Sequence, residues 1–149
     1  MTVVLRAARP LDAGATGEIL WRYLRETGWM PNLYSGAQTI AFCGKMIDRG
    51  WVTVAEADGR IVGFLARDGQ EICALYLNRA VWGKGIARLL LDDAKSQARA
   101  LRLRSFEANA RANRFYRRAG FVEVARCDGR DNAENLPDIT YVWPKEAAR

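Results

Sequence analysis

The sequence predicts a single domain of mixed α/β architecture, built on a mostly antiparallel sheet of six to seven strands with helices on both faces. Two observations lead to this expectation. The elements follow the order β-α-α-β-β-β-α-β-α-β-β, and tight turns join the early strands whereas helices separate later ones. Hairpins make antiparallel pairs, and a strand–helix–strand unit makes a parallel pair. With 149 residues, the chain from 1 to 149 fits one domain.

Seven segments are rich in apolar and β-branched residues, which is typical of strands. They are residues 3–7, 51–55, 61–67, 71–77, 103–108, 121–127 and 139–143. The pairs Asp58-Gly59 and Asp68-Gly69 favour hairpin turns between the second, third and fourth segments. Residues 71–77 are almost continuously apolar, so we expect this strand to lie near the centre of the sheet.

Four segments show the spacing of apolar residues that is typical of helices. They are residues 11–25, 37–48, 84–100 and 110–119. Gly50 and Gly120 follow the second and fourth of these, where a glycine commonly ends a helix. Asn109 directly precedes the fourth, which makes it a good N-cap.

The composition excludes several kinds of chemistry. The chain has no histidine, which rules out Ser-His-Asp and Cys-His catalysis and histidine-bound metals. Its three cysteines are too far apart for a metal site or a disulfide framework. We therefore expect no metal, and we expect Cys43 and Cys73 to be core thiols. The sequence has no signal-peptide pattern and no long apolar run, so a cytoplasmic protein without a membrane partner is expected.

The positive charge lies in one part of the chain. The net charge is +6, and residues 99–126 hold eight arginines against two acids, which equals the whole excess. Such a patch suits a polyanion, either nucleic acid or a phosphorylated small molecule, although a solvated helix face would look the same. Next to it, Gly83 and Gly85 separate a strand from a helix, where free backbone N–H groups favour an anion. An ordinary strand–helix turn is the alternative.

Two segments together resemble the GNAT superfamily, the acyl-CoA-dependent N-acyltransferases. The first, residues 82–87, reads Trp-Gly-Lys-Gly-Ile-Ala and is similar to the pyrophosphate loop Gln/Arg-x-x-Gly-x-Gly/Ala, with Trp82 where the family usually has Gln or Arg. The second is similar to Asn-x-x-Ala-x-x-Phe/Leu-Tyr-x-x-x-Gly-Phe. Its matching residues are Asn109, Ala112, Phe115, Tyr116, Gly120 and Phe121. The resemblance implies a GNAT-like sheet whose strands splay at the acyl-CoA site.

The resemblance also implies acetyl-CoA as co-substrate and a set of residues that bind it. These are Leu75, Leu77, Trp82, Gly83, Lys84, Gly85, Ile86, Ala87, Arg88, Asn109, Ala112 and Tyr116. Backbone groups of Leu75 and Leu77 would pair with the pantetheine arm, between residues 71–77 and 103–108. Lys84 or Arg88 would replace the side-chain contact of the usual Gln or Arg.

Two residues are implied as catalytic. Tyr116 is similar to the family's general acid, because a phenol can hydrogen-bond to or protonate a leaving thiolate. Glu71 lies near where histone-type members carry a basic glutamate, although a charged residue at a strand end is an equally good interpretation. Other acids that could serve as the base are Glu56, Asp131, Glu134 and Asp138.

The acceptor is expected to be a primary amine, with a small-molecule or amino-acid-like amine favoured over a peptide or protein amine. Trp29 and Tyr34 lie in the segment that usually walls the acceptor site and are the candidate substrate-binding residues. A non-catalytic acyl-CoA sensor and a nucleic-acid-binding module are the alternatives, and we do not expect the latter because no aromatic RNA-stacking pattern is present. The last strand could pair across a homodimer.

Overall fold

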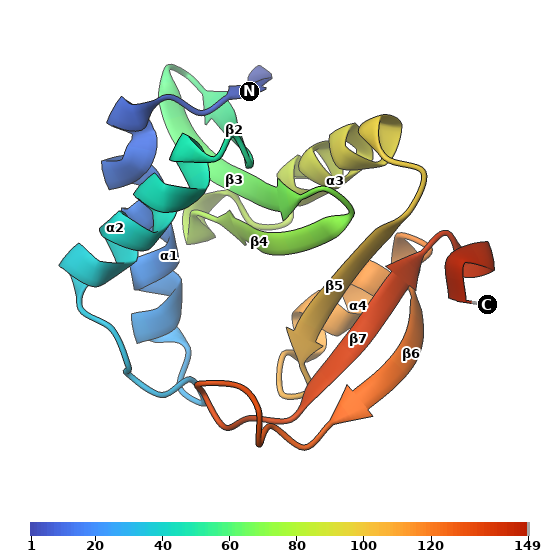
Figure 1. Ribbon diagram of the computed structural model, residues 1–149. Helices are drawn as coiled ribbons and strands as arrows, with labels where there is room; N and C mark the ends of the chain where they lie inside the picture. Colours follow the sequence, from blue (N-terminus) through green and yellow to red (C-terminus); the bar gives the residue numbers. More distant parts are fainter. Residues whose placement is uncertain (149) are drawn as a thin grey trace.

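In the computed structural model, which describes residues 1–148, one seven-stranded sheet holds the molecule together (Figure 1). Its strands are β1 (Val3–Ala7), β2 (Val52–Ala57), β3 (Arg60–Asp68), β4 (Glu71–Leu77), β5 (Leu101–Phe106), β6 (Val122–Cys127) and β7 (Asp138–Trp143). The helices are α1 (Ala13–Glu26), α2 (Gly36–Asp48), α3 (Ile86–Gln97) and α4 (Ala110–Arg118), with short 3-10 helices at Pro10–Asp12, Arg79–Val81 and Lys145–Ala148. No helix among these residues is long and apolar enough to cross a membrane.

The strand order is β1-β2-β3-β4-β5-β7-β6, and every neighbouring pair is antiparallel except β4 and β5. This confirms the predicted mostly antiparallel sheet with one parallel crossover. The last strand, β7, lies between β5 and β6, so both of its edges are already paired. The expectation that the last strand could pair across a dimer is therefore wrong for β7, because β1 and β6 are the edge strands.

Helices cover both faces of the sheet, as the sequence predicts. On one face, α1 and α2 pack on β2, β3 and β4 around a core that includes Met46 and Phe64. On the other, α3 and α4 pack around a core that includes Leu90, Leu103 and Tyr141. Figure 1 shows α1 and α2 in front of the sheet and α3 and α4 behind it. The sheet therefore separates two apolar layers, and a gap within the sheet connects its two sides.

Local sequence explains where most elements begin. Ser35 and Gln38 cap α2 reciprocally, each side chain bonding to the other's backbone N–H. The Asn109 side chain accepts a hydrogen bond of 3.2 Å from the Ala112 N–H and caps α4 as predicted. The strand predicted at 103–108 is shifted to Leu101–Phe106, because the preceding helix ends at Gln97 and Leu101 already pairs with β7.

The gap in the sheet lies between its two parallel strands. Only Glu71 of β4 and Arg102 of β5 are in register, supported by a hydrogen bond of 2.8 Å from the Arg102 N–H to the Gln70 carbonyl. Beyond this point the two strands diverge, which Figure 1 shows as the opening between the β4 and β5 arrows. The predicted splay of these strands is confirmed.

Candidate acyl-CoA and acceptor site

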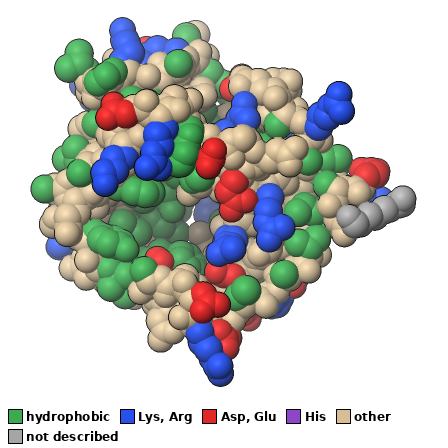
Figure 2. Space-filling view, in the orientation of Figure 1, with side chains coloured by type: hydrophobic (Ala, Val, Ile, Leu, Met, Phe, Trp, Pro, Cys, Tyr) green, Lys and Arg blue, Asp and Glu red, His purple; other side chains and the backbone are tan. Residues whose placement is uncertain are grey.

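A cleft of about 490 Å³ fills the opening between β4 and β5. Its walls come from these two strands, the turn before α3, and α4. In Figure 2 this opening is a hollow whose visible walls are largely hydrophobic. The lining includes eleven of the twelve residues that the family resemblance implies for acyl-CoA binding. These are Leu75, Leu77, Trp82, Gly83, Gly85, Ile86, Ala87, Arg88, Ala112 and Tyr116, together with Asn109. Lys84 lies on the exposed turn beside the cleft and does not line it.

The backbone of β4 faces the cleft with unpaired groups. The N–H of Asn78 bonds to the Val62 carbonyl of β3 at 2.7 Å, so by strand alternation Leu75 and Leu77 direct their backbone groups toward β5, from which β4 has separated. The register with β3 slips by one residue at Cys73, which is a β-bulge residue and is exposed in the cleft. The prediction of a core thiol is therefore correct for Cys43, which is buried, and wrong for Cys73.

The turn before α3 is shaped for close approach of a ligand to the backbone. Gly83 and Gly85 have φ angles of +79° and +82°, which L-residues with a Cβ rarely adopt. A Cβ built at either position would meet no atom within 4 Å, so open space lies in front of both. Gly85 is the N-cap of α3 and has no side chain to satisfy the first N–H groups of the helix. These donors and the positive end of the helix dipole suit an anion.

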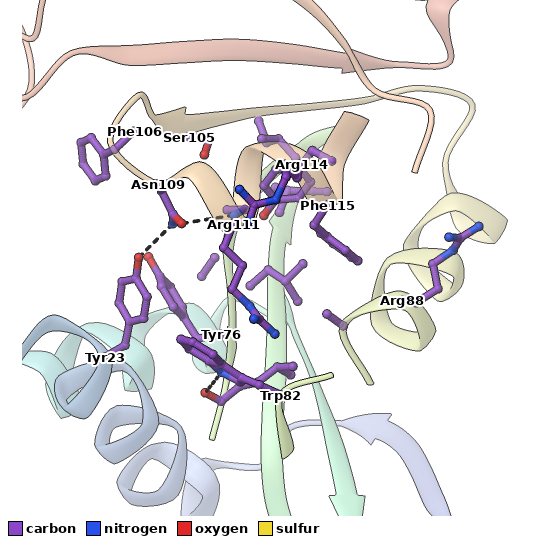
Figure 3. Close-up of a pocket in the computed structure, with 18 of the residues that line it drawn as sticks. Tyr23, Tyr76, Trp82, Arg88, Ser105, Phe106, Asn109, Arg111, Arg114 and Phe115 are labelled. Carbon is purple, nitrogen blue, oxygen red and sulfur yellow. Dashed lines mark hydrogen bonds between the residues drawn. The ribbon is translucent and has the colours of Figure 1, made fainter. Parts of the chain in front are cut away.

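The Trp82 ring, which lines the cleft, makes cation–π contacts with two arginines. Its ring lies 4.6 Å from the Arg111 guanidinium carbon and 4.7 Å from that of Arg79, and its indole N–H bonds to the Leu77 carbonyl at 3.3 Å. Figure 3 shows the Arg111 side chain extending toward Trp82. Arg88, by contrast, pairs with Asp92 one helical turn away, at 3.3 Å. Lys84 and Arg88 are the predicted replacements for the family's Gln or Arg. The arginines that contact the Trp82 ring are instead Arg79 and Arg111.

Positive charge surrounds the cleft. Four of the eight arginines of residues 99–126 line it, namely Arg104, Arg111, Arg114 and Arg118. All four side chains belong to exposed residues, so their guanidinium groups are open to a ligand. The excess charge that the sequence analysis located is therefore concentrated around one small-molecule-sized cleft, which favours a phosphorylated small molecule over an extended nucleic acid.

Tyr116 lies in the wall of the cleft on α4, between the two strands. It is 9% exposed and packs against Phe115, Phe121 and Tyr141, with ring centroids 5.4–6.1 Å apart. Among residues 1–148 its hydroxyl has no hydrogen-bond partner. Burial raises the pKa of the Tyr116 phenol above its usual value. The group therefore keeps its proton at neutral pH and can donate it to a hydrogen bond in the cleft.

A second set of polar groups links α1 to α4 across the cleft. The Asn109 side-chain amide donates a hydrogen bond of 2.9 Å to the Tyr23 hydroxyl, and the Tyr23 ring lies 5.0 Å from the Tyr76 ring (Figure 3). Asn109 thus caps its own helix and fixes Tyr23 at once. Burial and then the neighbouring tyrosines raise the pKa of Tyr76. Sequence reasoning missed Tyr23, because its partner lies 86 residues away.

A narrow side cavity of about 80 Å³ adjoins the cleft on the α1 side. Met30, Tyr76 and Phe106 line both spaces, so they form the boundary between them. Of the two residues predicted to bind substrate, Tyr34 lines this cavity and is 49% exposed. Trp29 packs edge-on against Phe106, with ring centroids 5.8 Å apart, and lines neither space.

The acids considered for the base differ in their positions. Glu71 lies at the closed end of the strand gap, half-buried, with its carboxylate 4.0 Å from Arg102, and it does not line the cleft. Glu56 is ion-paired with Arg6 at 2.7 Å, where β2 pairs with the edge strand β1. Asp138 accepts a hydrogen bond from Asn132 at 3.3 Å, and Asp131 lines no described cavity. Only Glu134 lines one, the side cavity.

Comparison with known proteins agrees with this geometry. The family model described as "Acetyltransferase (GNAT) domain" matches residues 48–123, half of the chain. This chain belongs to the GNAT acetyltransferase family. The matched residues contain β4, the glycine turn, α3 and the Asn109–Gly120 segment, which are the parts that form the cleft. The predicted family resemblance is thus confirmed.

Two curated relatives are peptidyl-lysine N-acetyltransferases called YjaB. The one from Salmonella typhimurium is 31% identical over 94 residues, which are 63% of this chain and 64% of the relative. The one from Escherichia coli is 35% identical over 94 residues, 62% of this chain and 63% of the relative. The matching segment therefore spans slightly less than two thirds of each relative's length.

Solved GNAT structures share the whole fold. The solution structure of apo YjaB from E. coli superposes with a TM-score of 0.81 at 24% identity, covering 96% of this chain and 98% of that one. YncA from S. typhimurium, described as a putative acetyltransferase with its cofactor acetyl-CoA, gives a TM-score of 0.72 at 21% identity, covering 95% and 92%. At these identities the likeness establishes the fold of this GNAT domain, including the predicted mixed sheet.

Proposed function

We propose that this protein is an acetyl-CoA-dependent N-acetyltransferase that acts on the side-chain amine of a lysine in a peptide or protein. The observation that carries the proposal is the cleft between β4 and β5, with an anion-binding turn at one end and a buried phenol, Tyr116, in its wall. Membership of the GNAT acetyltransferase family supports the reaction class.

The residues present fit the two chemically different parts of acetyl-CoA. The N-terminus of α3, with Gly83 and Gly85, and the guanidinium groups near it would hold the pyrophosphate. The unpaired backbone of Leu75 and Leu77 would take up the amide groups of the pantetheine arm, in the manner of an added strand. Leu77 has its carbonyl already bonded to Trp82, which leaves its N–H for this purpose.

The chemistry requires a neutral amine and a stabilised leaving group. Acetyl-CoA supplies an activated acetyl thioester. The amine nitrogen attacks the thioester carbon, the carbon–sulfur bond breaks, and the sulfur departs with the electron pair as a thiolate. Deprotonating a lysine of pKa about 10.4 at pH 7 costs roughly 4–5 kcal/mol, so the attacking amine must lose its proton to solvent or to a nearby base. Tyr116 would donate a hydrogen bond to the departing sulfur.

The acidity of a buried phenol favours one of two roles for Tyr116, because even an exposed tyrosine of pKa about 10 is a weaker acid than a thiol. A phenol whose pKa burial has raised is a weaker acid than an exposed tyrosine, so complete proton transfer to a thiolate of pKa about 8.5 is uphill. A hydrogen bond to the sulfur does not require that transfer. We therefore assign Tyr116 the role of a hydrogen-bond donor. The nitrogen that has formed the new bond to carbon carries a positive charge, and the second proton that it loses on becoming an amide would go to the released thiolate or to solvent.

The acceptor proposed here differs from the one that the sequence analysis favoured. From the sequence, a small-molecule or amino-acid-like amine is favoured, with a peptide or protein amine as the alternative. The curated relatives are named for peptidyl-lysine acetylation, which supports the alternative. The hollow is open to solvent (Figure 2), and Tyr34, which lines the adjoining side cavity, is exposed, so a peptide has room to approach.

The test is an acetylation assay on the purified full chain. The protein is incubated with acetyl-CoA and a mixed library of lysine-containing peptides, each with a blocked N-terminus, and a parallel set of small amines. Thiol release and a mass increase of one acetyl group on lysine are expected for peptides. Turnover of small amines only would overturn the acceptor assignment, and no turnover of either, with acetyl-CoA still bound, would overturn the enzymatic one.

A further inference from the structure

The loop between β6 and β7 brings one carboxylate to the acceptor side of the cleft. Glu134 lines the side cavity together with Trp21, Tyr34, Tyr76 and residues of the α1–α2 loop. In Figure 1 this β6–β7 loop lies beside the loop that joins α1 to α2. Glu134 is the sole acid among the residues that line this cavity, and Arg25 is the sole base.

The Glu134 carboxylate is not neutralised by the protein around it. Among residues 1–148 it takes part in no ion pair within 4.0 Å and in no side-chain hydrogen bond. The nearby Arg25 guanidinium is stacked on the Trp21 ring at 5.1 Å. After burial and the other tyrosines, the negative charge of Glu134 also helps to raise the pKa of Tyr76. The Glu134 carboxylate therefore acts electrostatically on Tyr76, which lies at the boundary between the two spaces, and it forms no ion pair within 4.0 Å in the part of the chain that the structure describes.

We propose that Glu134 and the aromatic wall of the side cavity bind the ammonium group of the incoming acceptor, and that this subsite selects a cationic, unbranched amine such as a lysine side chain. A carboxylate beside aromatic rings is a favourable environment for an ammonium ion. The cavity is small, about 80 Å³, which leaves little room for a branched group, and its boundary residues Met30, Tyr76 and Phe106 also line the cleft. The ammonium is thus captured next to the place where the thioester would lie.

This inference rests on the proposed function for its meaning, but its test does not need turnover. The probe is Nα-acetyl-lysine N-methylamide, and the comparison probe is its norleucine counterpart, which lacks the amine. Binding to the wild-type chain is followed by the amide chemical shifts in nuclear magnetic resonance spectra. The lysine probe is expected to shift resonances of the residues that line the side cavity, saturably and more strongly than the norleucine probe.

The variant pair Glu134→Gln and Asp131→Asn decides the assignment. Both remove one carboxylate from the same loop, but Asp131 is exposed and lines no described cavity. Losing a charged hydrogen-bond partner is expected to weaken lysine-probe binding roughly tenfold in Glu134→Gln. Asp131→Asn should bind like the wild type, and unchanged thermal unfolding of both variants would show that the fold is intact.

Two results would overturn this inference. One is equal binding of the lysine and norleucine probes by the wild type, and the other is equal weakening in both variants, which would indicate only the general charge of the loop. Failure of the proposed function is seen separately, as absent acetyl transfer to peptides. If the protein transfers acetyl groups to peptides but binds both probes equally, the proposed function stands and the Glu134 subsite is rejected.

Discussion

The guanidinium carbon of Arg111 lies 4.6 Å from the centre of the Trp82 ring. Trp82 occupies the position in the pyrophosphate loop where the family pattern has Gln or Arg. The contact uses the ring face, so it does not consume the N–H donors of the guanidinium. Among residues 1–148, Arg111 makes no ion pair within 4.0 Å. Trp82 therefore supplies no charge of its own but can hold a cation from α4 beside the glycine turn.

Replacing Trp82 by Leu is expected to weaken acetyl-CoA binding by about five- to thirtyfold. The physical reason is the loss of roughly 1–2 kcal/mol of cation–π interaction that positions the arginines. Isothermal titration calorimetry would measure it. Trp51→Leu is the matched control, because Trp51 carries a similar contact with Arg49, at 4.9 Å, and lines no described cavity. Equal affinity in both variants and the wild type would contradict the role of Trp82.

Replacing Gly85 by Ala is expected to reduce both stability and acetyl-CoA binding. The residue has a φ of +82°, and a left-handed residue with a Cβ costs roughly 1–2 kcal/mol. Gly50→Ala is the control, since Gly50 has a φ of +75° and equally open space around it but does not line the cleft. Urea unfolding should show similar losses for the two variants, whereas a binding titration should show weaker acetyl-CoA binding for Gly85→Ala alone. A similar affinity in both would argue against a ligand at the turn.

Replacing Tyr116 by Phe is expected to lower kcat by about 10²–10³, as for the loss of one hydrogen-bond donor to a developing negative charge, with acetyl-CoA affinity nearly unchanged. The substitution removes one hydroxyl, which has no partner among residues 1–148 and so leaves no buried group unsatisfied. Steady-state kinetics with a lysine peptide and a separate binding titration would measure the two effects. A variant with wild-type kcat would show that the departing sulfur does not depend on this phenol.

Local sequence predicted the parts of the site that are continuous in the chain. The glycine turn before α3 and the Asn109–Tyr116 segment each lie within about a dozen residues, so their spacing alone indicated an anion site and a helix cap. The hairpin turn at Asp58-Gly59, where both residues have positive φ, fixed the pairing of β2 with β3 in the same way. Such features depend on short-range backbone geometry, which a few neighbouring residues determine.

Contacts between residues far apart in the chain could not be predicted from the sequence. Arg111 and Arg79 meet on Trp82 because α4 packs beside the turn, and nothing in their local spacing predicts it. Glu134 lies in an irregular loop whose position depends on the whole sheet. Glu71 was correctly placed at the start of a central strand, but whether that end opens into the cleft depends on where β4 parts from β5.

The buried tyrosines predict a loss of stability at alkaline pH. Burial raises the pKa values of Tyr23, Tyr76 and Tyr116 in the folded protein, whereas an unfolded chain releases these protons near pH 10. Above about pH 10 the folded state therefore binds more protons than the unfolded state, and the free energy of unfolding must fall as the pH rises. Below pH 10 these groups are protonated in both states and contribute no slope.

Urea unfolding at a series of pH values from 8 to about 11 would measure this slope, and tyrosinate absorbance would report ionisation directly. Tyr116→Phe should flatten the decline, because it removes one of the groups that the folded state keeps protonated, while other groups such as lysines titrate equally in both proteins. An identical slope in the variant and the wild type would mean that Tyr116 ionises as easily in the fold as in the unfolded chain. A phenol with the usual pKa of about 10 is still protonated at neutral pH, so this result would remove the burial of the Tyr116 hydroxyl from the argument, and the kcat of Tyr116→Phe alone would decide its role as a donor.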